Sequence, residues 1–86
     1  MPHLLAKLHN VPLETIKEVL KKDKLFHASQ GMHLENIWQN ADAKNEVQFL
    51  FKIDNIDETK KLINQLHSDA LANDPNANLP EMTYLK

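Results

Sequence analysis

The five histidines are the residues of this sequence best suited to binding a metal ion or transferring a proton. His3 and His9 stand six residues apart in one predicted strand, which separates them by about 20 Å at about 3.3 Å per residue. Because Zn–N bonds are about 2.0–2.1 Å long, these two imidazoles cannot bind one ion within a chain. His27 and His33 flank a predicted turn and could approach each other, but no third ligand follows at a diagnostic spacing. Since the chain also has no cysteine, we expect no metal site and no thiolate chemistry.

Motifs that commonly mark enzyme active sites are absent. The chain has one glycine, Gly31, and therefore no glycine-rich phosphate loop, and it lacks the His-Glu-x-x-His and Gly-x-Ser-x-Gly patterns. His67, Ser68 and Asp69 are consecutive near the end of a predicted helix, where adjacent side chains point in different directions. The sequence therefore assigns no catalytic residue, and we expect no cofactor.

Hydrophobic periodicity divides the chain into strands and helices. The clearest strand is 46–53, because its apolar residues alternate and place Val47, Phe49, Phe51 and Ile53 on one face. A helix is predicted after Pro12, with apolar residues at helical spacing and charged residues, including Lys17 and Lys21, on its opposite face. The full prediction is four strands, at 3–9, 32–39, 46–53 and 81–85, and two helices, at 12–25 and 56–71.

Short polar residues and the single glycine mark the connections. Asn and Asp side chains bond their own backbone, so residues 40–45 predict the turn between the second and third strands. Asp54 and Asn55 offer a cap for the second helix. Gly31 stands at the start of a strand, where it marks a backbone turn that needs glycine.

The resulting order of elements, βαββαβ, is the ferredoxin-like pattern. It predicts an α+β fold with one four-stranded antiparallel sheet and both helices on one face. A chain of 86 residues has no room for a second core, so we expect a single domain over residues 1–86.

Composition limits the partners. The net charge of −2 gives no electrostatic reason to bind nucleic acid or an anionic membrane. No segment approaches the roughly 20 consecutive apolar residues of a membrane span, and the start has no signal-peptide pattern. We expect a cytoplasmic protein that binds neither nucleic acid nor membrane.

Two helices cover one side of the predicted sheet and leave the other side bare. In a monomer, Leu5 and Leu50 would lie exposed near the middle of that bare face, with Lys52 on the same side. A domain of this size without disulfide or metal has little stability to spare. We therefore predict a homodimer formed through this face, with Leu5, Leu50 and Lys52 in the interface.

The same face carries the candidate ligand-binding residues. A polar side chain that points into the dimer must find a partner, because burying it unpaired costs about 1–3 kcal/mol. Lys7 and Gln48 are in this position, where pairing across subunits or with water is the alternative to a ligand. His3 lies on the same face. Trp38 either packs in the core or at the subunit contact, or forms the wall of a small-molecule pocket.

The stretch over residues 31–86 resembles the dimeric α/β-barrel superfamily. The resemblance rests on Asn40-Ala41-Asp42 followed by Asn45-Glu46-Val47, on Asp54 before a helix, and on Pro80-Glu81 before a short last strand. Within the superfamily it is similar to small, mostly uncharacterised bacterial proteins related to the antibiotic-biosynthesis monooxygenase group. The first half departs from that pattern, with Val11-Pro12-Leu13-Glu14 where the family has aromatic residues, and Lys44 stands where proline is common. The resemblance implies a homodimer whose sheets face each other, and in some members a small-molecule pocket between sheet and helices.

Two functions remain open. The first is a non-enzymatic homodimer that binds a small molecule. The second is a cofactor-independent monooxygenase-like or isomerase-like enzyme that acts on a small aromatic or polyketide-like substrate, for which Trp38 and the histidines would be suitable residues. We favour the first, because the sequence displays no converging set of polar groups.

Overall fold

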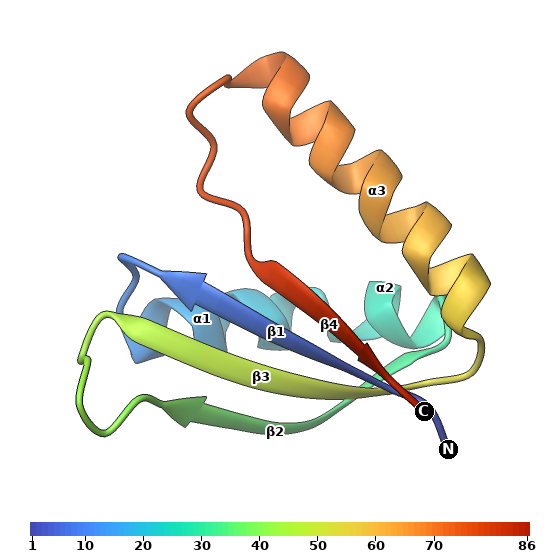
Figure 1. Ribbon diagram of the computed structural model, residues 1–86, viewed down its shortest axis with the longest axis horizontal. Coiled ribbons are helices and arrows are strands. Elements are labelled where there is room, and N and C mark those ends of the chain that lie inside the picture. Colours follow the sequence, from blue (N-terminus) through green and yellow to red (C-terminus); the bar gives the residue numbers. More distant parts are fainter.

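The computed structural model describes residues 1–86 as one antiparallel sheet with three helices (Figure 1). The strands lie in the order β2–β3–β1–β4, and each neighbouring pair is antiparallel. This topology confirms the predicted ferredoxin-like fold. The strand bounds coincide with the predicted ones: β1 (His3–His9), β2 (Met32–Gln39), β3 (Glu46–Ile53) and β4 (Glu81–Leu85).

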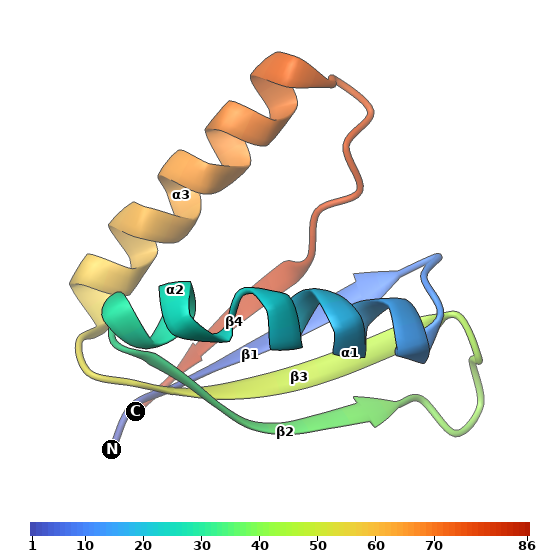
Figure 2. The same cartoon turned by 180° about the vertical axis from the view of Figure 1, so that it is seen from behind.

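The first predicted helix, 12–25, is wrong in one respect, because the structure divides it in two. Helix α1 spans Leu13–Lys22 and α2 spans Lys24–Ser29. Asp23 leaves the helical conformation at φ −94° and ψ 7°, while its N–H still donates to Val19 O at 3.0 Å. No glycine or proline marks this break. It turns the chain so that α2 packs against β2 (Figure 2).

The core lies between the sheet and the helices. Along β3 every second residue is buried, as the alternation predicted, and the rings of Phe49 and Phe51 meet edge to face at 5.8 Å. Alternate residues of β1 extend the same buried face, because the strand period is two. The full core comprises Leu4, Ala6, Ile16, Leu20, Met32, Val47, Phe49, Phe51, Ile53 and Ile63.

Helix α3 (Ile56–Asn73) packs on this core only through its first half. Asn55 caps it as predicted, since its side-chain oxygen accepts a hydrogen bond from the N–H of Glu58 at 2.9 Å. Ile63 is buried, but Leu66 and Leu71 are exposed, and the last turns rise away from the sheet in both views (Figures 1 and 2). None of the helices has the length and apolar character needed to span a membrane.

Two predicted turns form at the residues that indicated them in the sequence, Gly31 and Asn40. Gly31 has φ +73°, a conformation open to glycine without strain, and a Cβ at this position would lie 3.0 Å from Asp54 Oδ2. In the turn after β2, Asn40 Oδ1 accepts a hydrogen bond from the N–H of Asp42 at 2.8 Å. The N–H of Asn40 in turn donates to Glu46 O at 2.9 Å, which closes the β2–β3 hairpin.

Candidate functional site

A cavity of about 340 Å³ lies between the α1–α2 segment and the sheet. Its size falls at the lower end of the roughly 300–1,000 Å³ typical of small-molecule sites. Phe51 contributes from β3, and Leu20 and Ala28 contribute from the two helices. More than half of its lining side chains are apolar: Leu20, Ala28, Met32, Leu34, Ile37 and Phe51.

The polar residues of the cavity are all basic or imidazole groups, and no carboxylate lines it: Lys17, Lys21, Lys24, His27 and His33. Lys17 Nζ is 3.9 Å from Glu14 Oε1, and His33 Nε2 is 3.6 Å from Asp54 Oδ1. Lys21 and Lys24 take part in none of the five ion pairs of the structure. The cavity therefore combines an apolar lining with three lysines and two imidazoles, and it has no acidic side chain.

His27 is a titratable residue that lines the cavity and contacts one of its aromatic side chains. Its imidazole stacks edge-on against the ring of Phe51, with 5.2 Å between centroids. Burial lowers the pKa of His27 from its ordinary value of 6.5, although the charge of Asp23 acts in the opposite direction. The imidazole is therefore neutral at pH 7, when it can accept a proton or a hydrogen bond.

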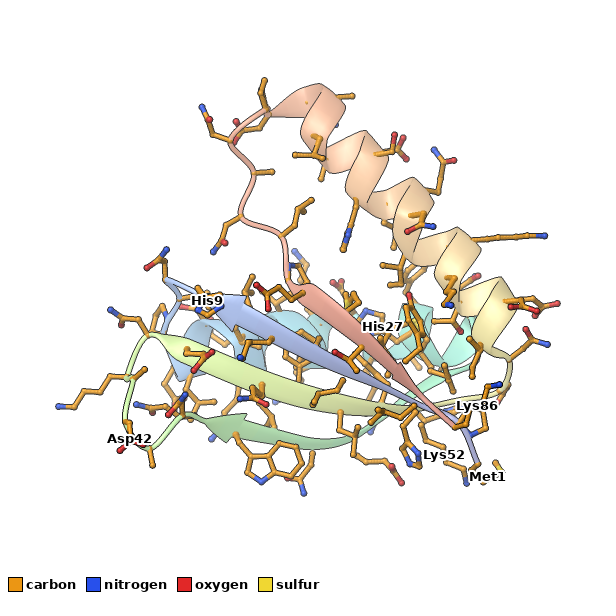
Figure 3. The ribbon with its side chains drawn as sticks, viewed as in Figure 1. Met1, His9, His27, Asp42, Lys52 and Lys86 are labelled. Atoms are coloured by element: carbon orange, nitrogen blue, oxygen red, sulfur yellow. The ribbon has the colours of Figure 1, made fainter.

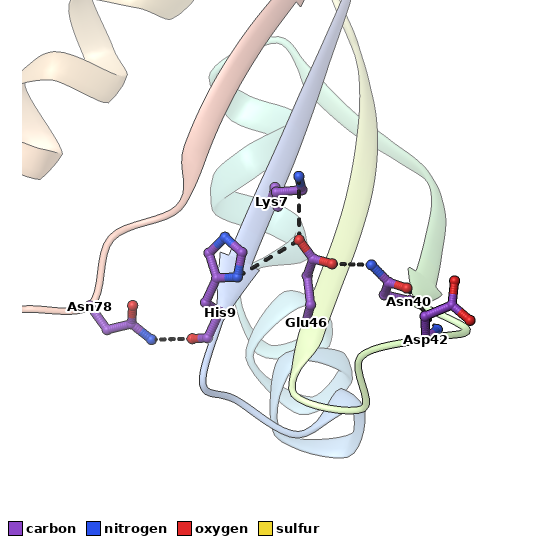
Figure 4. A network of polar contacts seen from close by, with 6 residues as sticks. All are labelled: Lys7, His9, Asn40, Asp42, Glu46 and Asn78. Carbon is purple, nitrogen blue, oxygen red and sulfur yellow. Dashed lines mark hydrogen bonds and ion pairs between the residues drawn. The ribbon is translucent and has the colours of Figure 1, made fainter.

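A second polar cluster lies on the opposite, open face of the sheet (Figure 4). Glu46 is nearly buried there, and its Oε1 is 3.3 Å from Lys7 Nζ and 3.7 Å from His9 Nδ1. The amide of Asn40 donates a hydrogen bond to Glu46 Oε2. This hydrogen bond, together with Lys7, lowers the pKa of Glu46 against the opposing effect of burial. Asn78 extends the cluster by donating to the backbone oxygen of His9 at 2.6 Å.

The predicted ligand-binding and interface residues all lie on this open face. The strand register pairs Trp38 with Gln48, Leu5 with Leu50, and His3 with Lys52. Lys7 joins them and is paired with Glu46, while His3 Nε2 lies 2.7 Å from Glu35 Oε1. Trp38 is 46% exposed, so it does not pack in the core of the chain. The open face thus carries all of the predicted residues on the side of the sheet away from the cavity, but His3 and Lys52 lie four residues along their strands from Lys7 and Gln48. The functions of these residues stay predictions.

The two ends of the sheet can be told apart by the residues that lie there. Met1, Lys52 and Lys86 lie at one end, whereas His9 and Asp42 lie at the other (Figure 3). The Glu46 cluster belongs to the His9 end.

The cavity residues were not predicted as a site. Lys17, Lys21, Lys24 and Ala28 recur at intervals of three and four residues, which is the spacing of one helical face. This spacing was visible in the sequence, but it is also typical of a polar helical face that is exposed to solvent. Only the packing of α2 against β2 places these residues around a cavity.

No group of three or more potential ligands converges anywhere in the chain to hold a metal ion. His27 and His33 both line the cavity, but His33 faces Asp54 at 3.6 Å and no third ligand joins them. The absence of a stoichiometric metal stays a prediction for elemental analysis.

The fold has counterparts among solved structures. A Deinococcus radiodurans protein, described as a candidate antibiotic biosynthesis monooxygenase, has a TM-score of 0.62 at 13% sequence identity, and the match covers 100% of this chain and 91% of that one. An uncharacterised NIPSNAP domain protein from Burkholderia xenovorans has a TM-score of 0.57 at 17% identity, over 100% and 93%. A protein from Agrobacterium tumefaciens has a TM-score of 0.58 at 14% identity, over 100% and 92%.

No family model and no curated protein sequence matches the chain. At these identities the comparison establishes the fold. The chain shares that fold with an antibiotic-biosynthesis-monooxygenase-like protein, as the sequence resemblance predicted, and also with a NIPSNAP domain protein.

Proposed function

We propose that this protein is a homodimer that binds a small molecule in the cavity between α1–α2 and the sheet. The cavity carries the proposal, since it joins an apolar lining to a few polar groups, as small-molecule sites do. The fold shared with the Deinococcus radiodurans protein supports the same reading, because a monooxygenase must hold its substrate.

The dimer is supported by the apolar side chains of the open face. Leu5 and Leu50 lie opposite each other in the register of β1 and β3. Trp38 and Leu85 are 46% and 41% exposed, near the two edges of the same sheet. A standard specific interface removes about 800 Å² per partner from water. At about 25 cal/mol per Å² of apolar area, an interface of that size would offset the several kcal/mol that association costs.

An enzymatic function is the second candidate, and one observation favours it. His27 is a half-buried imidazole whose pKa is lowered by burial, and it lines the cavity. A neutral imidazole there could take a proton from a bound phenol or another weakly acidic carbon or oxygen centre. No carboxylate lines the cavity beside it, so binding remains the better-supported function.

Thermal unfolding with a library of small molecules tests the proposal. A ligand at one hundred times its Kd stabilises the folded state by about 2.7 kcal/mol, which raises the Tm of a domain of this size by about 10 °C or more. Ala28→Phe, which places a bulky ring at a residue that lines the cavity, should abolish the shift. Ala72→Phe, at an exposed position of α3, should preserve it. A shift that persists in Ala28→Phe would refute binding at this cavity.

The same library separates the two candidates. A ligand that raises the Tm and is recovered unchanged after incubation in air supports binding alone. A ligand that is consumed by the native protein but not by His27→Gln supports the enzyme.

A further inference from the structure

The positive charge of this chain is concentrated beside the cavity. All ten of its cationic residues other than histidine are lysines, and four of them fall within residues 17–24, although the net charge of the chain is −2. Three of these four, Lys17, Lys21 and Lys24, line the cavity, whereas Lys22 does not.

The lining lysines differ in whether they form ion pairs. Glu14 lies 3.9 Å from Lys17, at the limit of an ion pair. Lys21 and Lys24 form no ion pair with a carboxylate. Lysines beside a low-dielectric wall, without a carboxylate in the cavity, raise the local concentration of anions.

The apolar lining determines the other part of a ligand. Met32, Ile37 and Phe51 from the sheet, with Leu20 from α1, form a surface that an inorganic anion would leave uncovered. An apolar group that covers this surface gains about 25 cal/mol per Å². The cavity thus offers an apolar contact and a cationic contact to the same molecule.

We infer that the ligand of this cavity is a small organic anion, with an apolar body against Phe51 and a carboxylate or sulfonate group at Lys21 and Lys24. The inference rests on the proposed small-molecule function and specifies the class of the ligand. The His27 ring would contact the apolar body of the ligand, because it packs on Phe51 and both residues line the cavity.

Two fluorescent probes test the inference directly. 8-Anilinonaphthalene-1-sulfonate and N-phenyl-1-naphthylamine share one aromatic body and differ by the sulfonate. The native protein should bind the anionic probe about tenfold more tightly, a difference of about 1.4 kcal/mol, which corresponds to about 0.7 kcal/mol from each of the two lysines. This preference should decrease as the salt concentration rises.

Matched double variants separate a local effect from the overall charge. Lys21→Gln with Lys24→Gln should remove the tenfold preference and leave the affinity for the neutral probe unchanged. Lys22→Gln with Lys61→Gln changes the net charge equally at positions outside the cavity, and it should retain the preference. Glutamine has nearly the same helix propensity as lysine, so both variants should fold.

The possible results distinguish this inference from the function on which it rests. If both probes bind equally, or if the two double variants lose affinity for the anionic probe equally, the anionic ligand is wrong while the binding site stands. If neither probe binds, or if Ala28→Phe binds both as well as the native protein does, the proposed function itself fails.

Discussion

Lys7 Nζ lies 3.3 Å from Glu46 Oε1 on the open face of the sheet, although the strand register places Lys7 opposite Gln48. The ion pair is therefore diagonal between β1 and β3. The sequence indicated that Lys7 needs a partner on this face. The structure supplies one within the same chain, namely Glu46.

Because of Glu46, the free energy of unfolding should depend on pH in the acid range. The hydrogen bond from Asn40 and the charge of Lys7 lower the pKa of Glu46 below its ordinary value of 4.5. The folded state therefore keeps this carboxylate ionised at a pH where the unfolded chain is already protonated. Its contribution is complete above about pH 4.5 and is lost as the pH falls through the folded pKa.

Glu46→Gln should consequently be less stable than the native protein at pH 7 and should lose less stability between pH 5 and pH 3. Urea unfolding followed by circular dichroism at each pH measures both effects. Asn40→Ala should act in the same direction, because it removes the first donor to Glu46. A Glu46→Gln protein with the native pH profile would show that the carboxylate does not contribute in this way.

Leu50→Asp should convert the dimer to a monomer or prevent folding. In a two-fold dimer, Leu50 lies near its own counterpart or near Leu5 of the other subunit, so each aspartate would replace an apolar contact by a charge that loses its water on association. Light scattering at micromolar concentration should give twice the 9.9 kDa chain mass for the native protein.

Leu25→Asp is the matched control for this experiment. Leu25 lies on α2 and is 85% exposed, away from the open face, so the variant should remain dimeric. A folded native protein with the mass of one chain would refute the dimer.

Gly31→Ala should lower the free energy of unfolding by about 1–2 kcal/mol, the cost of a left-handed conformation for a residue with a Cβ. The new methyl group would also lie 3.0 Å from Asp54 Oδ2. Asp54→Ala combined with Gly31→Ala should recover only the part due to this contact. Urea unfolding of the two variants measures the difference, and an unchanged midpoint in Gly31→Ala would contradict the argument.

The parts of the fold that could be predicted are those fixed by local chemistry. The alternation in β3 follows from a strand period of two. The Asn40 and Asn55 hydrogen bonds lie within three residues of their donors. Gly31 was identifiable because it is the only glycine in the chain. None of these features depends on a contact with a distant part of the sequence.

The parts that could not be predicted depend on tertiary packing. Asp23 ends α1 without a glycine or proline to signal it. Lys21 and Lys24 have the spacing of a solvated helical face, and they line a cavity only because α2 packs on β2. The departure of the last turns of α3 from the sheet is likewise absent from the sequence pattern, since Leu66 continues the apolar stripe and is nevertheless exposed.

His27 provides the last prediction, because its pKa reports directly on the cavity. Above pH 6.5 the imidazole is neutral in both the folded and the unfolded state. As the pH falls through 6.5, the unfolded chain takes up a proton before the folded one does, because burial lowers the folded pKa. Stability should therefore decline from about pH 6.5 downward until the folded pKa is passed, and His27→Gln should show a smaller decline over that range.

Proton NMR titration measures this pKa in the native protein. The His27 ring signal, assigned by its loss in His27→Gln, should have a midpoint below 6.5. The charge of Asp23 raises the pKa of the ring, and the other charged and titratable residues that line the same cavity are Lys17, Lys21, Lys24 and His33. A bound anion opposes the burial effect, since it favours the protonated imidazole. The midpoint should therefore be higher when 8-anilinonaphthalene-1-sulfonate saturates the cavity than when N-phenyl-1-naphthylamine does, because the neutral probe buries the imidazole without supplying the anion. A midpoint at or above 6.5 in the free protein would show that His27 is not held in the apolar environment of the cavity.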